Sequence, residues 1–167
     1  MTGIKKSVIL NANKMPSMQI TSHSEKETQK IAERFAATLT GGDIVCLRGE
    51  LGAGKTTFVK GLAKALGVRE QITSPTFTLM NVYPLSASPQ DSAVNALVHI
   101  DTYRLKNEQE LLDIGAADYL GQPTTITIIE WPEKISGILK NKKVINIAID
   151  HFEKNSRIFT IASTLPA

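Results

Sequence analysis

The chain has 167 residues, of which 42% are hydrophobic and 21% are charged, and its formal net charge is +3. This size and composition predict one globular domain with a real hydrophobic core. The mild charge gives no argument for direct RNA binding. A single cysteine, Cys46, excludes a disulfide framework. No apolar run reaches the length of a membrane span or of a signal peptide, so a cytoplasmic protein without membrane contact is expected.

Hydrophobic periodicity and turn residues predict helices and strands along the chain, except in its first segment, which shows no periodicity. Residues 1–20 are expected to form an irregular N-terminal leader, and residues 21–167 a single domain. Ser24 and Glu27 have the spacing of a capping box, which predicts the start of the first helix. The expected elements follow in the order helix 24–40, strand 43–48, helix 56–66, strand 76–83, strand 94–100, helix 108–120, strand 124–129, helix 133–139, and strands 144–149 and 157–162.

Residues 49–56 read Gly-Glu-Leu-Gly-Ala-Gly-Lys-Thr and form a complete Walker A motif, GxxxxGKT. The glycines let successive backbone N–H groups turn toward an anionic phosphate chain. Lys55 can reach the β- and γ-phosphates, and the hydroxyl of Thr56 can bind Mg²⁺. A strand before the motif and a helix after it provide the context in which a helix N-terminus binds phosphate. Nucleotide binding is therefore predicted for Glu50, Leu51, Gly52, Ala53, Gly54, Lys55, Thr56 and Thr57.

With this motif, the alternation of helices and strands predicts an α/β fold. We expect a single P-loop NTPase-like domain, whose central sheet is mixed parallel and antiparallel and is flanked by helices. The polar segment 84–92 is expected to be a long exposed hairpin loop. No guanine-reading NKxD motif is present, so ATP is the expected nucleotide.

A P-loop also needs a carboxylate at the end of a nearby strand, where it completes the magnesium shell and orients water. Asp101 and Glu130 each follow an apolar run, and spacing alone does not decide between them. Thr76, after a Ser-Pro turn, is similar to a threonine that senses the γ-phosphate, or is an ordinary turn residue. Arg104 is either a source of charge for the transition state or part of a surface ion pair. His99 reads as a structural residue.

Four motifs of this chain belong together. They are Gly-Glu-Leu-Gly-Ala-Gly-Lys-Thr-Thr at 49–57, Ser-Pro-Thr-Phe-Thr-Leu at 74–79, His-Ile-Asp-Thr-Tyr-Arg-Leu at 99–105 and Ile-Glu-Trp-Pro at 129–132. In this order and spacing they resemble the bacterial TsaE (YjeE) family, over roughly residues 24–163. The resemblance implies a small Mg²⁺-dependent ATPase that acts with the proteins TsaD and TsaB. Its role would be the threonylcarbamoyl modification of the adenosine next to the anticodon in tRNA.

The resemblance also implies roles for particular residues. Thr56 and Glu130 would hold Mg²⁺, and the catalytic residues would be Lys55, Asp101, Glu130 and Thr76. His99, Tyr103 and Arg104 would belong to the active surface, and Trp131 would lie beside the site. The start of the first helix near Ser24 and the turn that ends at Arg157 would border the base.

Two other functions stay open from the residues alone. One is an ATP-gated protein-binding switch with little hydrolysis, and the other is a small-metabolite kinase with Asp101 as its base. The sequence also leaves open whether the chain contacts tRNA directly or only through its protein partners.

Overall fold

The computed structural model describes residues 6–9, 17–85 and 93–164. The strands are β1 Lys6–Ile9, β2 Ser17–Ser22, β3 Ile44–Arg48, β4 Met80–Pro84, β5 Ala96–Asp101, β6 Thr125–Glu130, β7 Val144–His151 and β8 Arg157–Thr164. The helices are α1 Glu25–Ala36, α2 Lys55–Ala65, α3 Gln109–Asp113 and α4 Ser136–Leu139, with short 3₁₀ helices η1 Ala116–Asp118 and η2 Pro132–Ile135.

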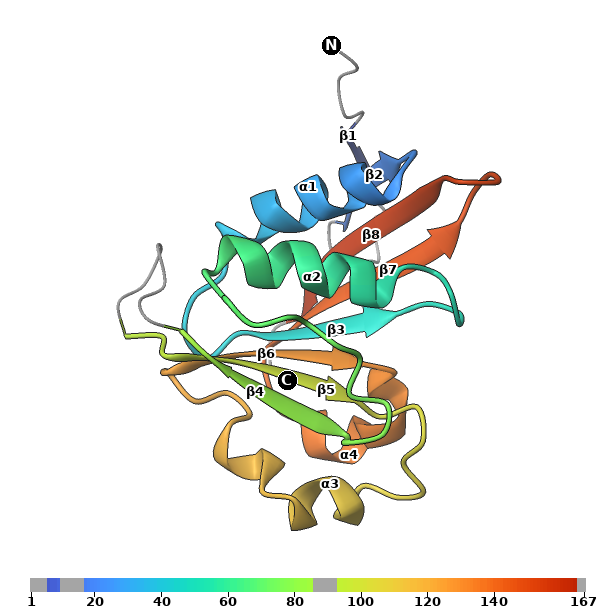
Figure 1. The fold of residues 1–167 in the computed structure, drawn as a ribbon. Coiled ribbons are helices and arrows are strands. Elements are labelled where there is room, and N and C mark those ends of the chain that lie inside the picture. Colours follow the sequence, from blue (N-terminus) through green and yellow to red (C-terminus); the bar gives the residue numbers. More distant parts are fainter. Residues whose placement is uncertain (1–5, 10–16, 86–92, 165–167) are drawn as a thin grey trace.

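The eight strands form one sheet in the order β1-β2-β8-β7-β3-β6-β5-β4. The central strands β7, β3, β6 and β5 run parallel, and the remaining strands pair antiparallel at the two sides. Figure 1 shows helices on both faces of this sheet. The predicted α/β fold with a mixed sheet is therefore confirmed. Among the described residues, none of the helices is both long and apolar enough to cross a membrane.

Alternating side chains of the central strands build a separate core on each face of the sheet. Val45 and Leu47 of β3 pack with residues of α1 and α2 on one face. Ile44 and Cys46 pack on the other face, in a core that includes Leu111 of α3. Strands buried on both faces read as continuous apolar runs, which is why β3 was readable from its sequence.

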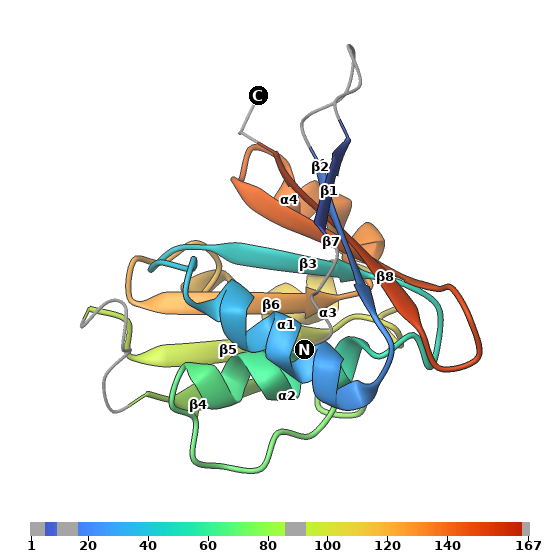
Figure 2. The ribbon, with the colours of Figure 1, turned by 90° about the horizontal axis from the view of Figure 1, so that it is seen from above.

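Helices α1 and α2 lie side by side across one face (Figure 2). The predicted cap of α1 is present, because the Ser24 hydroxyl accepts a hydrogen bond from the backbone N–H of Glu27 at 3.2 Å. The Glu27 carboxylate in turn accepts from the N–H of His23 at 2.8 Å. The helix ends at Ala36, earlier than the predicted Thr40, and a turn closed by Asp43 leads from it to β3.

Other predicted boundaries also differ from the structure. Strand β4 starts at Met80 and not at residue 76, because residues 76–78 form a turn. The predicted helix 108–120 is interrupted where Gly115 adopts φ 80°, which leaves α3 and η1 in its place. Residues 86–92 of the predicted loop 84–92 lie outside the described part of the chain, while Pro84 still belongs to β4.

Residues 1–20, which we expected to be irregular, contain the strand β1 and the first part of β2. β1 pairs antiparallel with β2, and β2 pairs antiparallel with β8 near the other end of the chain. The buried side chain of Ile20 joins the core under α1 and α2. Strands this short carry little periodicity of their own. β2 is ordered by its pairing with β8, which is distant in sequence. The division into a leader 1–20 and a domain 21–167 stays a prediction.

The close crossing of α1 and α2 depends on Gly61. A β-carbon at this position would lie 2.6 Å from the carbonyl oxygen of Gln29 and 2.7 Å from its Cα. We expect Gly61→Ala to lower the free energy of unfolding by about 2 kcal/mol, because overpacking separates the helices. Alanine favours a helix over glycine by about 1 kcal/mol, and this gain would be smaller than the loss from overpacking. Urea unfolding measures it, with the exposed Lys60→Ala as the control in the same helix. An equally or more stable Gly61→Ala protein would contradict this packing.

Cys46 should be chemically inert in the folded protein. Its side chain is buried on β3, and burial raises the pKa of its thiol to about 12. The reactive thiolate is therefore scarce at any ordinary pH. We expect a thiol reagent at mildly alkaline pH to label the denatured protein quickly and the native protein only at the rate of unfolding. Rapid labelling of native protein would show that β3 is more accessible than described.

Candidate functional site

The loop between β3 and α2 leaves open space on the side where its glycines lie. Gly52 and Gly54 adopt φ 79° and 103°, values that side chains rarely tolerate. A β-carbon at either position would have no described heavy atom within 4 Å. Gly54 is also the residue that precedes the first turn of α2. The loop therefore presents its backbone to an open cradle at a helix N-terminus, as the Walker A motif predicts.

Lys55 lies at the bottom of this cradle and is only 5% exposed. Its ammonium group donates to the carbonyl oxygens of Gly49 at 2.8 Å and Glu50 at 3.0 Å, and it lies 4.0 Å from the centre of the Trp131 ring. Burial lowers the pKa of Lys55, and the charges of Glu130 and Asp101 oppose that shift. The lysine is thus held in place beneath the loop by contacts within the protein.

Thr56 and Glu130 meet beside the lysine. The Thr56 hydroxyl donates to Glu130 Oε1 at 3.3 Å, and His99 Nε2 lies 3.0 Å from the same oxygen. Glu130 is 3% exposed and His99 is fully buried. The contact arises because β6 is the parallel neighbour of β3, and both strands end at the same edge of the sheet. Of the two acids that spacing left open, Glu130 is the one that contacts Thr56.

Asp101 has a different set of contacts at the end of β5. Its Oδ2 accepts hydrogen bonds from the hydroxyls of Thr76 and Ser74, the latter at 3.1 Å. Its Oδ1 accepts from the backbone N–H of Tyr103 at 2.9 Å. Asp101 therefore fastens the turn before β4 to the edge of the sheet. The predicted residues Thr76 and Asp101 are brought together, one strand farther from the P-loop than Glu130.

Trp131 follows Glu130 in a left-handed backbone conformation, with φ 61°. Such a conformation costs a residue other than glycine about 1 to 3 kcal/mol and concentrates at functional sites. Its ring packs against Tyr103 at a centroid distance of 5.1 Å, and its carbonyl accepts from Thr102 at 2.6 Å. These contacts fix the indole over Lys55.

The rim of the site carries exposed apolar groups. Leu51 in the loop is 75% exposed and Phe77 is 81% exposed. The guanidinium of Arg104 lies 4.2 Å from the centre of the Phe77 ring, so this arginine stacks on an aromatic side chain. Among the described residues no ion pair of Arg104 is found. Of the two roles that the sequence left open for Arg104, the structure therefore does not support the ion pair.

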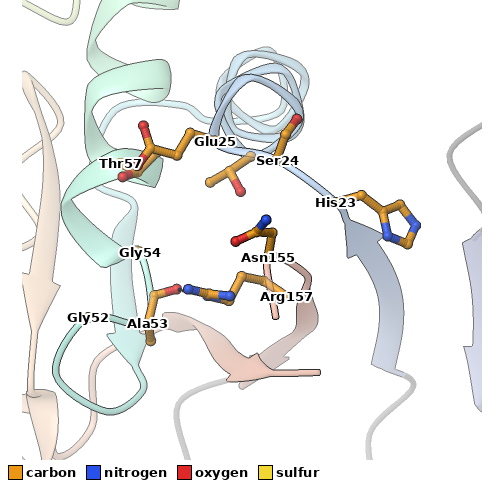
Figure 3. Close-up of a pocket in the computed structure, with 10 residues that line it drawn as sticks. His23, Ser24, Glu25, Gly52, Ala53, Gly54, Thr57, Asn155 and Arg157 are labelled. Atoms are coloured by element: carbon orange, nitrogen blue, oxygen red, sulfur yellow. Dashed lines mark hydrogen bonds between the residues drawn. The ribbon is translucent and has the colours of Figure 1, made fainter. Parts of the chain in front are cut away.

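Two cavities meet at the glycine loop. A cleft of about 550 Å³ lies on the side of the acids, and its walls are formed by Leu51, Gly52, Gly54, Lys55, Thr56, Thr57, Ser74, Thr76, Asp101, Tyr103, Arg104, Glu130 and Trp131. A second cavity of about 330 Å³ lies on the side of α1, and Gly52, Gly54 and Thr57 border both. Figure 3 shows this second cavity between the start of α1 and the β7–β8 turn.

Arg157 supports the loop from the second cavity. Its Nε donates to the carbonyl oxygen of Ala53 at 3.0 Å, and Figure 3 shows the side chain directed at that residue. Arg157 also lines the cavity, together with Ser24 at the start of α1. The two segments that the family resemblance placed near the base therefore do lie together beside the loop. Glu50 is the exception among the predicted residues, because its exposed side chain lines neither cavity.

Sequence reasoning missed some wall residues of the second cavity. His23 and Glu25 line it, although neither belongs to a recognisable motif, whereas Asn155 lies in the turn that the family resemblance placed beside the base. The ring of His23 is held by Ser156 Oγ, 3.0 Å from Nδ1. His23 and Ser156 are far apart in sequence, so no local pattern could have paired them.

Comparisons with known proteins show which proteins this chain is similar to. Residues 22–159 match the family model described as "Threonylcarbamoyl adenosine biosynthesis protein TsaE". Proteins named "tRNA threonylcarbamoyladenosine biosynthesis protein TsaE" are similar to this chain. The one from Aquifex aeolicus is 42% identical over 118 residues, which is 70% of this chain and 77% of the relative. The one from Treponema pallidum is 37% identical over 145 residues, or 87% of this chain and 100% of the relative.

A solved structure has the same fold. The crystal structure of Bacillus subtilis YdiB superposes with a TM-score of 0.71 at 29% sequence identity, covering 91% of this chain and 88% of that one. The residues matched by the family model include the loop, the strand-end acids and the segments around the second cavity. The resemblance inferred from four short motifs is thereby confirmed, and the chain belongs to the TsaE family.

Proposed function

We propose that this protein is a Mg²⁺-dependent ATPase required for the threonylcarbamoyl modification of the adenosine next to the anticodon in tRNA. It would act in the cytoplasm with TsaD and TsaB, and it would contact tRNA directly or through these partners. The observation that carries the proposal is the convergence of an open glycine cradle, a buried Lys55 and the Thr56–Glu130 pair in one cleft. The names of the relatives support the biological role.

The donor atoms of the cleft suit Mg²⁺. This ion prefers oxygen ligands and usually takes only one or two groups from a protein, with phosphate oxygens and water as the rest. Thr56 and Glu130 offer a hydroxyl and a carboxylate side by side. The described residues contain no cluster of three or more histidine, cysteine or acidic side chains that could hold a metal alone. When bound, the ion would neutralise charge on the β- and γ-phosphates.

The two cavities suggest how a nucleotide would lie. The phosphates would follow residues 50–57, with the γ-phosphate toward Lys55, Thr76 and Asp101 in the larger cleft. The nucleoside would occupy the second cavity, between the start of α1 and Arg157. The shared wall formed by Gly52, Gly54 and Thr57 permits this continuous path.

The protein alone should hydrolyse ATP slowly. Asp101 and Glu130 are the carboxylates among the residues that line the cleft. Asp101 accepts three hydrogen bonds, and one oxygen of Glu130 already has two partners. Asp101 is therefore engaged by its donors, and the other oxygen of Glu130 would be taken up by the ion, so neither acid is left to act as a base for water. Lys55 would stabilise the charge of the transferred phosphoryl group, which is the main demand of such transition states. A partner protein would complete the site.

Substitution of the two central residues should separate binding from turnover. We expect Lys55→Ala to weaken ATP binding about 100-fold, because a buried charge-assisted contact to phosphate is lost. Glu130→Gln keeps the size of the side chain and should retain ATP binding but lower Mg²⁺-dependent turnover about 100-fold. Calorimetric titration and phosphate release measure the two quantities.

Matched controls are available close by. Lys60→Ala removes an exposed lysine of the same helix, and Glu133→Gln removes an exposed acid three residues beyond Glu130. Both should behave like the unaltered protein. Normal turnover in Glu130→Gln would refute its assignment to the metal, and normal binding in Lys55→Ala would refute the phosphate site.

The partner requirement tests the biological role. We expect weak ATP hydrolysis by the purified protein with Mg²⁺, a several-fold rise when TsaB, TsaD and tRNA are added, and loss of the rise in Glu130→Gln. Hydrolysis indifferent to these partners would contradict the role in tRNA modification. ATP-dependent association without any turnover would instead favour the protein-binding switch. Phosphate recovered on an added small molecule would favour the kinase.

A further inference from the structure

We propose that His99 is a positioning residue, whose ring N–H holds the Glu130 carboxylate in the orientation that binds Mg²⁺. This inference rests on the function proposed above. It assigns a task to His99, which the sequence identifies only as part of a motif. The argument depends on where the ring lies, which of its nitrogens carries the proton, and what the contact leaves free on Glu130.

The ring of His99 reaches Glu130 along one face of the sheet. β5 and β6 are parallel neighbours, with His99 opposite Ile128 and Asp101 opposite Glu130. Leu97 and Ile128 lie in the core under α1 and α2, so the alternation of each strand places His99 and Glu130 on that same face. The ring is fully buried and spans the remaining gap, with Nε2 at 3.0 Å from Glu130 Oε1.

The partners of the His99 ring determine which of its nitrogens donates a hydrogen to Glu130. An ionised carboxylate only accepts hydrogen bonds, so Nε2 must carry a hydrogen and donate it. The other nitrogen, Nδ1, is buried and has no hydrogen-bond partner among the described residues. Nε2 is therefore the ring nitrogen that holds Glu130, and it does so by donating its hydrogen.

This contact restricts how Glu130 can turn. Oε1 accepts from His99 on β5 and from Thr56 at the start of α2, so two donors from different elements define the plane of the carboxylate. No hydrogen bond to the second oxygen, Oε2, is found within the described ranges. Oε2 is thus the oxygen left for the ion or for water bound to it, while the Thr56 hydroxyl keeps its lone pairs for the same purpose.

Simple packing does not account for a histidine at this position. The neighbouring side chains Leu97 and Ile128 are aliphatic and buried. An aliphatic residue would fill such a site without burying an unsatisfied nitrogen, which costs free energy. The hydrogen bond to Glu130 is the polar contact that the described residues give to the ring. In metal sites, partners that orient a ligand in this way typically change metal affinity about 10- to 100-fold when they are removed.

Two substitutions of similar length isolate the N–H group. His99→Gln keeps a donor near the position of Nε2, and His99→Met removes it. The readout is the Mg²⁺ concentration that half-saturates ADP binding, followed by the emission of Trp131, which is the single tryptophan of the chain and lies over Lys55. ADP binding without Mg²⁺ is measured in parallel. Thr127→Val is the control, since it alters a fully buried polar side chain of β6 that has no hydrogen-bond partner in the described part of the chain.

We expect His99→Met to raise the half-saturating Mg²⁺ concentration about 10-fold or more, with ADP binding in the absence of Mg²⁺ unchanged. His99→Gln should remain within a few-fold of the unaltered protein, and Thr127→Val should match it. Should His99→Met fail to fold, His99→Asn takes its place, because its shorter amide does not reach Glu130 and should weaken Mg²⁺ binding equally.

Three outcomes would overturn the inference. They are an unchanged Mg²⁺ requirement in the folded variant without a donor, an equal loss in His99→Gln, or an equal loss of ADP binding without Mg²⁺, which would indicate a merely structural role. The proposed function fails separately, because it requires the unaltered protein to show Mg²⁺-dependent nucleotide binding. A protein that binds Mg²⁺–ADP normally and ignores the loss of the His99 donor would therefore refute only the role of His99.

Discussion

The parallel pairing of β3 with β6 is the constraint on which the site depends. The register that sets Leu47 beside Glu130 ends both strands at one edge of the sheet, directly below the start of α2. Thr56 and Glu130 meet there although they are far apart in sequence. A shift of β6 by one residue would turn Glu130 to the opposite face and remove the acid from the cleft. The position of the acid therefore follows from the pairing of strands.

Burial on both faces explains why this edge is rigid. The same alternation that sends Val45 and Leu47 to one core sends Ile44 and Cys46 to the other. A slip of register by one residue would send each set into the core of the other face, where its side chains do not match the packing, so the two cores together hold the strand ends in place. The glycine loop faces open space at Gly52 and Gly54, while Lys55 and Arg157 hold its carbonyl oxygens. It can be open and unobstructed because the elements on either side of it are fixed.

Local sequence patterns predicted those parts of the structure that depend only on residues close together in sequence. The Walker A loop, the cap at Ser24 and the apolar central strands were recognisable because each is determined by a few neighbouring residues. Spacing could not choose between Asp101 and Glu130, because the choice depends on which strand lies next to β3, and only the family resemblance favoured Glu130. For the same reason it could not pair His99 with Glu130. The strand β2 escaped notice because its order comes from β8, near the other end of the chain.

The hydrogen bond from Arg157 to the Ala53 carbonyl links the loop to the outer part of the sheet. Arg157 begins β8, and it is paired with Ser22 at the end of β2, so segments from both ends of the chain meet at this point. The pairing of β2 with β8 is thus connected to the phosphate loop through one side chain. A substitution that weakens the pairing of these outer strands would therefore act on the position of the Ala53 carbonyl, although it is remote from the loop in sequence.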